Sequence, residues 1–267
     1  MTTSFLYSTP AYIIAIFLFA GIIIIHIFSF WVITYQRKHY PNLTSTNIGF
    51  LEGALLGLLS LLLAFTFNKS ASNYETRQDL LVGEANDIGT VFYRADLYND
   101  SIQKQFKIEF KKYLSARIDY YQAGTDEKKI QNALQNASLI SKRIWQIASR
   151  VSKQPDVQTR SMQMIPAINN MIDAVSKREA ARIVRVPESI IWLLLFLTLV
   201  GSFIIGYASD SKKINYIILI IYSLMTVMTI YLILDLDRPR RGLIDTNLLH
   251  QNMEQLFIPQ TNETENN

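Results

Sequence analysis

Residues Ile48–Phe67 read IGFLEGALLGLLSLLLAFTF, and this stretch decides the architecture of the chain. At about 1.5 Å per residue, roughly 20 apolar residues form a helix long enough to cross the hydrocarbon core of a bilayer. No proline interrupts the sequence from Ile48 to Leu97. We therefore expect one helix that crosses the membrane and continues, with a polar composition, to about Leu97.

Three further apolar runs accompany this stretch, at residues 11–35, 188–208 and 214–234. The first of them lacks the basic start and the small-residue cleavage site of a secretory signal peptide, so we interpret it as a retained membrane span. With residues 48–67, the sequence therefore predicts four transmembrane helices.

The interval at residues 68–187 is polar, and its apolar residues recur with helical spacing. No alternating strand pattern of useful length occurs in it. Asp100–Ser101 and Thr125 are the expected caps of two of its helices. The predicted fold class is an all-α membrane protein with a cytoplasmic helical domain inserted between the second and third transmembrane helices.

Short segments flank these parts, an N-terminal tail at residues 1–10 and a C-terminal segment at residues 235–267. The end of the chain from Gln260 is polar and rich in Asn, a composition typical of disorder. Lys and Arg are more frequent at the membrane face that carries the long polar interval than at the face of the two short loops. The positive-inside rule therefore predicts that the helical domain and both termini are cytoplasmic.

Composition excludes several function classes. The chain has no Cys, which excludes disulfides and thiolate metal sites. His26, His39 and His250 lie in different segments and show no metal-ligand spacing. No phosphate-binding loop, dinucleotide fingerprint or nucleophile motif occurs, so we expect no enzyme, cofactor or metal. The net charge of +4 fits contact with anionic lipid, and no basic stripe with aromatic residues predicts nucleic-acid binding.

Ionisable residues inside an apolar span are functional candidates, because burying a charge in lipid is costly. Glu52 either sets ion selectivity as a ring of charge in an oligomer or serves a structural role by pairing or reaching the membrane surface. Leu58, Leu62 and Phe65 are candidates for an apolar constriction that gates by dewetting, with ordinary lipid or core contact as the alternative. For His26 the structural reading, a neutral ring hydrogen-bonded between helices, is favoured over a functional one.

Gly49, Gly53 and Gly57 recur at every fourth position of the same stretch, so they share one face of its helix. Small residues let helix backbones approach closely within a membrane. This face is predicted to serve helix packing, either within one subunit or between subunits.

Charged and polar residues gather where the second and fourth helices reach the same face of the membrane. Opposite charges at a boundary of low dielectric should pair, because an unpaired charge there is expensive. We therefore expect a polar network, mainly with a structural role, that joins the extension of the second helix to the end of the fourth. Its expected members are Arg77, Glu84, Asn86, Arg94, Asp96, Asp235, Asp237, Arg238, Arg240 and Arg241.

Two segments carry a family resemblance. The first is Leu61–Phe67 (LLLAFTF), followed by Glu84-Ala85-Asn86 and Arg94–Leu97 (RADL), and the second is Leu234–Ile244 (LDLDRPRRGLI). Together they resemble the bacterial bestrophin-like domain family over nearly the whole chain. The layout is also similar, more loosely, to bestrophins, which are pentameric anion channels whose second membrane helix lines the pore.

The resemblance implies a homo-oligomer, a pentamer by analogy, with membrane lipid and a small inorganic ion as partners. The bestrophin pore-neck and calcium-clasp sequences are not found in this chain. Glu52 near the outer mouth would oppose anion entry by Coulomb repulsion, which leaves cation conduction open. The sequence thus predicts an oligomeric inner-membrane ion channel or channel-like pore lined by its second transmembrane helix. The alternative is a non-conducting scaffold or sensor that binds a partner through its cytoplasmic helices.

Overall fold

The computed structural model describes residues 5–39, 49–209 and 213–238, and every element within these ranges is a helix. The chain divides into two compact units, the first made of Met1–Tyr74 and Arg185–Ile244 and the second chiefly of Glu75–Val184. The predicted all-helical class is confirmed. One helix, α3 (Gly49–Ala95), contributes its first part to the first unit and its second part to the other.

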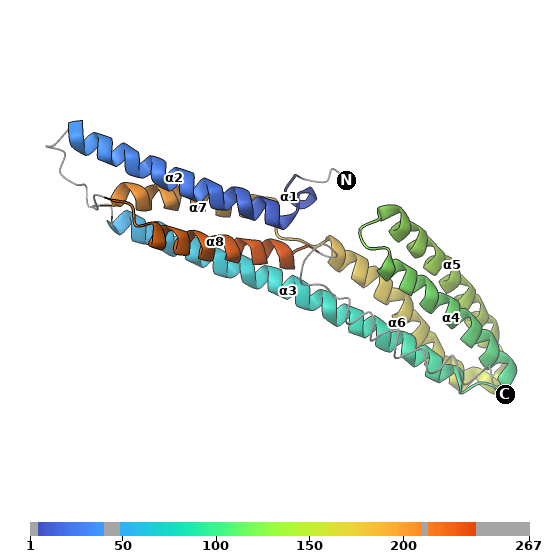
Figure 1. Ribbon diagram of the computed structural model, residues 1–267. Helices are drawn as coiled ribbons and strands as arrows, with labels where there is room; N and C mark the ends of the chain where they lie inside the picture. Colours follow the sequence, from blue (N-terminus) through green and yellow to red (C-terminus); the bar gives the residue numbers. More distant parts are fainter. Residues whose placement is uncertain (1–4, 40–48, 210–212, 239–267) are drawn as a thin grey trace. The chain divides into compact units, whose positions relative to one another are not determined.

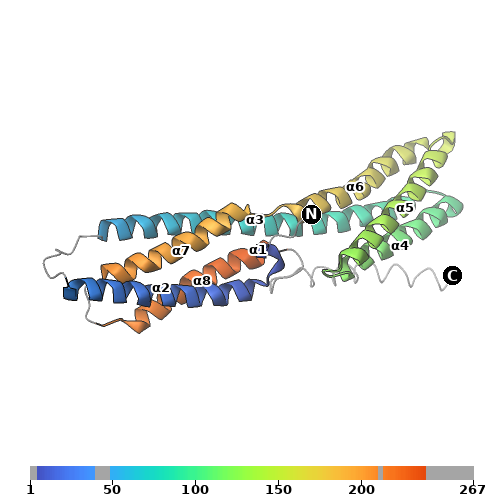
Figure 2. The ribbon, with the colours of Figure 1, turned by 90° about the horizontal axis from the view of Figure 1, so that it is seen from above.

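The first unit contains the apolar helices. Besides α3, they are α2 (Ala11–His39), α7 (Glu188–Ala208) and α8 (Tyr216–Leu236), preceded by the short helix α1 (Phe5–Ser8). The candidate membrane spans in the described residues number four, by length and composition, and they run along one another (Figures 1 and 2). Helix α2 packs on both α7 and α8.

Close packing of α2 on α7 depends on small residues. A Cβ added at Gly206 would lie 2.7 Å from the His26 carbonyl oxygen and 3.1 Å from the Ser29 Cβ, so only glycine fits there. The Ser202 hydroxyl donates to the Ile22 carbonyl at 2.8 Å. Hydrogen bonds of this kind hold helices together where lipid gives no hydrophobic drive for association.

His26 is buried in the same interface, where its ring bonds to the Ser202 backbone. This placement agrees with the structural reading of that residue. The apolar span was predicted at residues 11–35, and α2 continues beyond it through Arg37 and Lys38 to His39. The Tyr207 hydroxyl of α7 donates to the Gln36 side chain at 2.7 Å, which continues the contact into the added turn.

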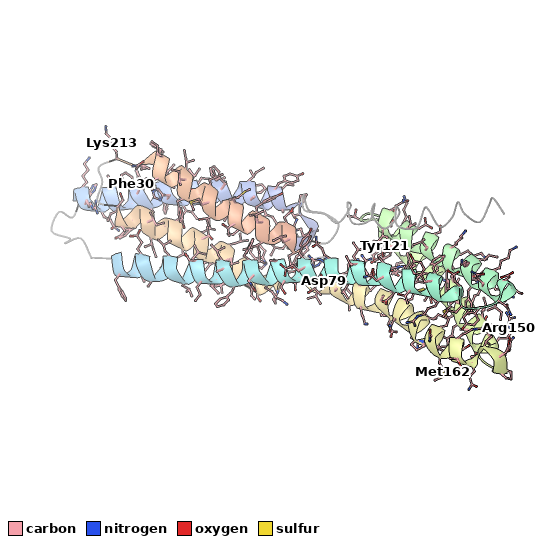
Figure 3. The ribbon with its side chains drawn as sticks, turned by 90° about the horizontal axis from the view of Figure 1, so that it is seen from below. Phe30, Asp79, Tyr121, Arg150, Met162 and Lys213 are labelled. Atoms are coloured by element: carbon pink, nitrogen blue, oxygen red, sulfur yellow. The ribbon has the colours of Figure 1, made fainter. Side chains whose placement is uncertain are left out.

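The second unit is a bundle of α4 (Asp100–Gln122), α5 (Glu127–Val151) and α6 (Gln158–Ile183) with the second part of α3. A 3-10 turn, Pro155–Val157, precedes α6. Figure 3 shows side chains filling the space between these helices. The core consists of apolar residues at helical spacing from all four helices; among the most deeply buried are Ile88, Phe106, Phe110, Ile144 and Ile168.

The predicted helix caps were each wrong by one residue. Asn99, not Asp100–Ser101, caps α4, and its Oδ1 accepts from the Ile102 N–H at 3.1 Å. Asp126, not Thr125, caps α5, accepting from the Lys128 N–H at 3.0 Å. A cap needs extended backbone and an acceptor that reaches the amide two or three residues ahead, and the short carboxamide and carboxylate satisfy both conditions one position away from the predicted residues.

Candidate functional site

The first part of α3 buries one narrow stripe against its own unit. The stripe consists of Leu59, Thr66, Ser70 and Asn73, whose exposed fractions are 6% or less. These positions are separated by seven, four and three residues, so they share one side of the helix. The most apolar 18-residue window of α3 has 11% of its residues buried, against 39% for the corresponding window of α8. Most of this apolar helix therefore has no partner within the described part of the chain.

The glycines of this segment lie on its free side. A Cβ added at Gly53 or Gly57 would meet nothing within 4 Å, and Gly49, Ser60 and Ala64 are also exposed. The glycines that pack tightly within the unit are on α7 and α2 instead. Among the described residues, Gly53 and Gly57 therefore make no close approach to another helix, and packing between subunits stays a prediction.

The four candidate pore residues do not share one face. Leu58 and Phe65, seven residues apart, are 44% and 66% exposed and lie on a free flank of α3. Leu62 is half-buried at the border of the packed stripe. Glu52 is half-buried as well, and it precedes Leu59 by seven residues, which puts it on the packed side. The structure thus separates Glu52 and Leu62 from the free face.

A buried carboxylate at the end of α8 joins four segments of the first unit. Asp237 is 1% exposed, and its oxygens accept from the Val186 N–H at 2.9 Å, the Asn73 side-chain amide at 3.2 Å and the Tyr7 hydroxyl at 2.9 Å. Burial and the neighbouring Asp237 raise the pKa of the Tyr7 phenol well above its ordinary value, so Tyr7 stays a hydrogen-bond donor. We call this group the Asp237 hub.

Arg238, the next residue, holds the start of the chain. Its guanidinium donates to the Thr9 and Leu6 carbonyl oxygens, at 2.6 Å each, and the side chain is 6% exposed. These carbonyl groups lie at the end of α1 and just before α2. An arginine can satisfy two backbone acceptors at once because its donors form a rigid fork.

A second buried cluster lies in the second unit and centres on Glu84, which is 0% exposed. Its carboxylate accepts from Nε and Nη2 of Arg117 on α4 and from Arg178 Nη1 on α6, the last at 2.8 Å. The Tyr121 hydroxyl donates to it at 2.6 Å, and Figure 3 labels this tyrosine within the helical bundle. We call this group the Glu84 cluster.

The charges of the Glu84 cluster fix its protonation. Burial raises the pKa of the Glu84 carboxyl, but the Arg117 and Arg178 guanidinium groups outweigh burial and hold it below its ordinary value. Burial and Glu84 raise the pKa of Tyr121 far above that of a free phenol. The carboxylate therefore stays ionised and ties α3 to both α4 and α6.

Arg94, near the end of α3, and Asp96, just after this helix, also bond within the second unit. The Arg94 guanidinium donates to the Gln163 carbonyl of α6. Asp96 forms an ion pair with Lys107 at 2.6 Å.

The structure describes contacts for several predicted members of the polar network. Asn73 of α3 bonds to Asp237 at the end of α8, whereas Glu84, Arg94 and Asp96 bond within the second unit. The wider link between α3 and the end of α8 stays a prediction. The remaining predicted members have varied positions: Asp235 is buried, Arg77 is half-buried, Asn86 is exposed, and Arg240 and Arg241 lie outside the described residues.

Sequence reasoning missed the partners of both clusters. One signal was present, because Arg117 continues the apolar series Phe106, Phe110 and Tyr113 at helical spacing on α4. A charge in a core register indicates a buried partner. No local feature of the sequence identifies Tyr7 or Val186 as a partner of Asp237. The described residues contain no group of three His, Asp or Glu side chains that could hold a metal ion.

The fold and these features define an all-helical membrane protein with four candidate spans and a helical unit between the second and third. The family model of the Bestrophin-like domain matches residues 14–247, and the chain belongs to this family. A comparison with the curated proteins finds no match. The fold is that of a bacterial bestrophin homologue from Klebsiella pneumoniae, solved as a point mutant, with a TM-score of 0.71 and 13% identity over 92% of this chain and 98% of that one.

Proposed function

We propose that this protein is an oligomeric ion channel, with the first part of α3 lining the pore. One observation carries the proposal: α3 is an apolar span that leaves most of its surface without a partner in its own chain, within a bestrophin-like fold. In a ring of subunits the central helix turns its packed side toward its own unit and its free side toward the axis and the neighbours. A pentamer is the arrangement expected by analogy.

Helical geometry then assigns the pore-facing row. Positions opposite the Leu59–Asn73 stripe are Phe50, Gly57, Leu61, Ala64 and Asn68, at about 100° per residue. Phe50 is 88% exposed and Leu61 is 53% exposed. These two side chains, about 16 Å apart along the helix, form two apolar constrictions of the proposed pore, which close by dewetting.

The two flanks of this row meet the neighbouring subunits. One flank carries the large residues Leu58 and Phe65, and the other carries the small residues Gly53 and Ser60. In a cyclic ring each subunit presents one flank to its neighbour's opposite flank, so large side chains meet small ones. This refines the predicted pore face, since Leu58 and Phe65 serve the interface, and Glu52 does not line the axis.

The distribution of charge sets the proposed orientation of the protein in the membrane. The positive-inside bias favours the helical domain and both termini in the cytoplasm. The similarity to a bacterial homologue supports a bacterial inner membrane. The permeating species is a small inorganic ion, and no catalytic step takes place.

Because the chain has no Cys, a single introduced Cys is the only target for a thiol reagent. Leu61→Cys protein, purified and placed in liposomes, should conduct until a charged, water-soluble thiol reagent is added, after which the flux should stop. Met225→Cys is the control, because Met225 is 68% exposed on α8 and should keep its flux. Flux at the level of empty liposomes under varied voltage, calcium and pH would favour the non-conducting scaffold instead. A block at Met225→Cys but not at Leu61→Cys would refute the assignment of α3.

A further inference from the structure

Polar residues replace leucines where the packed stripe of α3 approaches the end of its apolar segment. Leu59 opens the stripe, but Thr66, Ser70 and Asn73 continue it, all 6% exposed or less. The Thr66 hydroxyl donates to the Leu62 carbonyl of its own helix at 2.7 Å, so this bond does not depend on the position of α3. A side-chain bond to another segment does depend on it, because it forms in one position of the helix and is lost in another.

Asn73, the last of these polar groups, is bonded to the end of α8. The Asn73 amide donates to Asp237 at 3.2 Å. Asp237 also holds Val186 and Tyr7, so the carboxylate stays anchored without Asn73. The Asn73–Asp237 bond is therefore a contact that α3 can make or break against a fixed acceptor.

The second polar group is unsatisfied in this position of the helix. Ser70 lies one turn before Asn73 and is 0% exposed, yet its hydroxyl has no hydrogen-bond partner in the described structure. A desolvated hydroxyl without a partner is unfavourable. It thus opposes the position that the Asn73–Asp237 bond favours.

We propose that Ser70 and Asn73, with Asp237 as the fixed acceptor, form a switch between two positions of α3. The Asn73–Asp237 bond stabilises the observed position, and the unbonded Ser70 hydroxyl favours a second position in which it finds a partner. This inference rests on the proposed function where it concerns gating, since movement of the pore helix changes the open fraction. The switch itself is a property of α3 whether or not ions pass.

The two residues give opposite predictions. Asn73→Leu removes the bond to Asp237. The population of the observed position of α3, relative to the second position, should fall about tenfold. Ser70→Ala removes the unsatisfied hydroxyl and should raise this relative population about fivefold. Ser223→Ala is the matched control, because the Ser223 hydroxyl is buried but already donates to the Leu219 carbonyl at 2.7 Å.

Hydrogen–deuterium exchange at residues 66–74 of the full-length protein in detergent micelles measures the switch without any flux. Exchange should speed up in Asn73→Leu, slow down in Ser70→Ala and not slow down in Ser223→Ala. If Asn73→Leu does not fold, Ser70→Ala alone decides, since one removed oxygen leaves the packing intact. Unchanged or faster exchange in Ser70→Ala would mean that the hydroxyl bonds locally, and this result would overturn the proposal.

Liposome flux then tests gating. The two variants should change the flux of a conducting wild type in opposite directions, and changes in the same direction would overturn the gating role. If the wild type passes no ions but exchange changes with opposite signs, the channel proposal fails while the switch is upheld.

Discussion

The buried carboxylate of the Glu84 cluster provides a quantitative test of the second unit. Glu84→Gln keeps the shape of the side chain but removes its charge, which leaves two guanidinium groups without their anion. Arg117 is 0% exposed and Arg178 is 14% exposed, so solvent cannot replace the carboxylate at Arg117. Removing one partner of a buried ion pair costs about 3–5 kcal/mol. In a chain of this size, a loss of 1 kcal/mol lowers Tm by about 2–4 °C. Glu84→Gln should therefore lower Tm by roughly 10 °C.

Thermal unfolding of the detergent-solubilised protein, followed by circular dichroism, measures this loss. Glu109→Gln is the matched control, because Glu109 pairs with Lys112 and Arg143, whose side chains are each 52% exposed. Exposed pairs contribute up to about 1 kcal/mol, so the control should melt within a few degrees of wild type. A Glu84→Gln protein that melts with the Glu109→Gln control would refute the reasoning that the Glu84 cluster holds α3, α4 and α6 together.

The stability difference between wild type and Glu84→Gln should also depend on pH. The folded pKa of Glu84 lies below its unfolded value of about 4.3. Its contribution is therefore fully present above pH ~4.3 and is lost as the pH falls through the folded pKa. The stability difference between wild type and Glu84→Gln should be constant near neutral pH and should shrink in acid. A difference that grows in acid would contradict the ionised state assigned to Glu84.

Three smaller substitutions test other contacts by the same melting assay. Gly206→Ala forces a Cβ against the His26 carbonyl and should cost about 1–3 kcal/mol; an unchanged Tm would show that α2 and α7 can separate freely. Gly83→Ala meets nothing within 4 Å in the middle of α3 and should stabilise the protein by up to about 1 kcal/mol; destabilisation would reveal an unseen contact. Arg94→Ala frees the Gln163 carbonyl and should cost about 1 kcal/mol, whereas Arg94→Lys should recover part of that loss.

Much of the architecture could be predicted because it depends on local patterns. Apolar runs of about 20 residues mark the spans, and helical spacing with few prolines marks the bundle helices. The uninterrupted sequence from Ile48 predicted a continuous helix to about Leu97, and α3 ends at Ala95. The predicted caps of α4 and α5 were each wrong by one residue, because several adjacent polar residues can each serve as a cap.

The partners of the polar residues could not be predicted in the same way. The sequence showed that Glu84 and Asp237 each needed a partner, since a buried charge is costly without one. It could not show that Glu84 meets Arg117 and Arg178 while Asp237 meets Asn73, because residues far apart in the chain are matched only when the helices pack.

The amino-acid sequence alone determined the helices, the four apolar spans and the family resemblance, since hydropathy and helical period are properties of consecutive residues. Only the tertiary structure decided which side of α3 is packed and which is free. That choice depends on how the helix is rotated about its axis against its neighbours. A rotation of half a turn would exchange Glu52 and Asn73 for Phe50 and Asn68 on the packed side without altering the hydropathy of any segment.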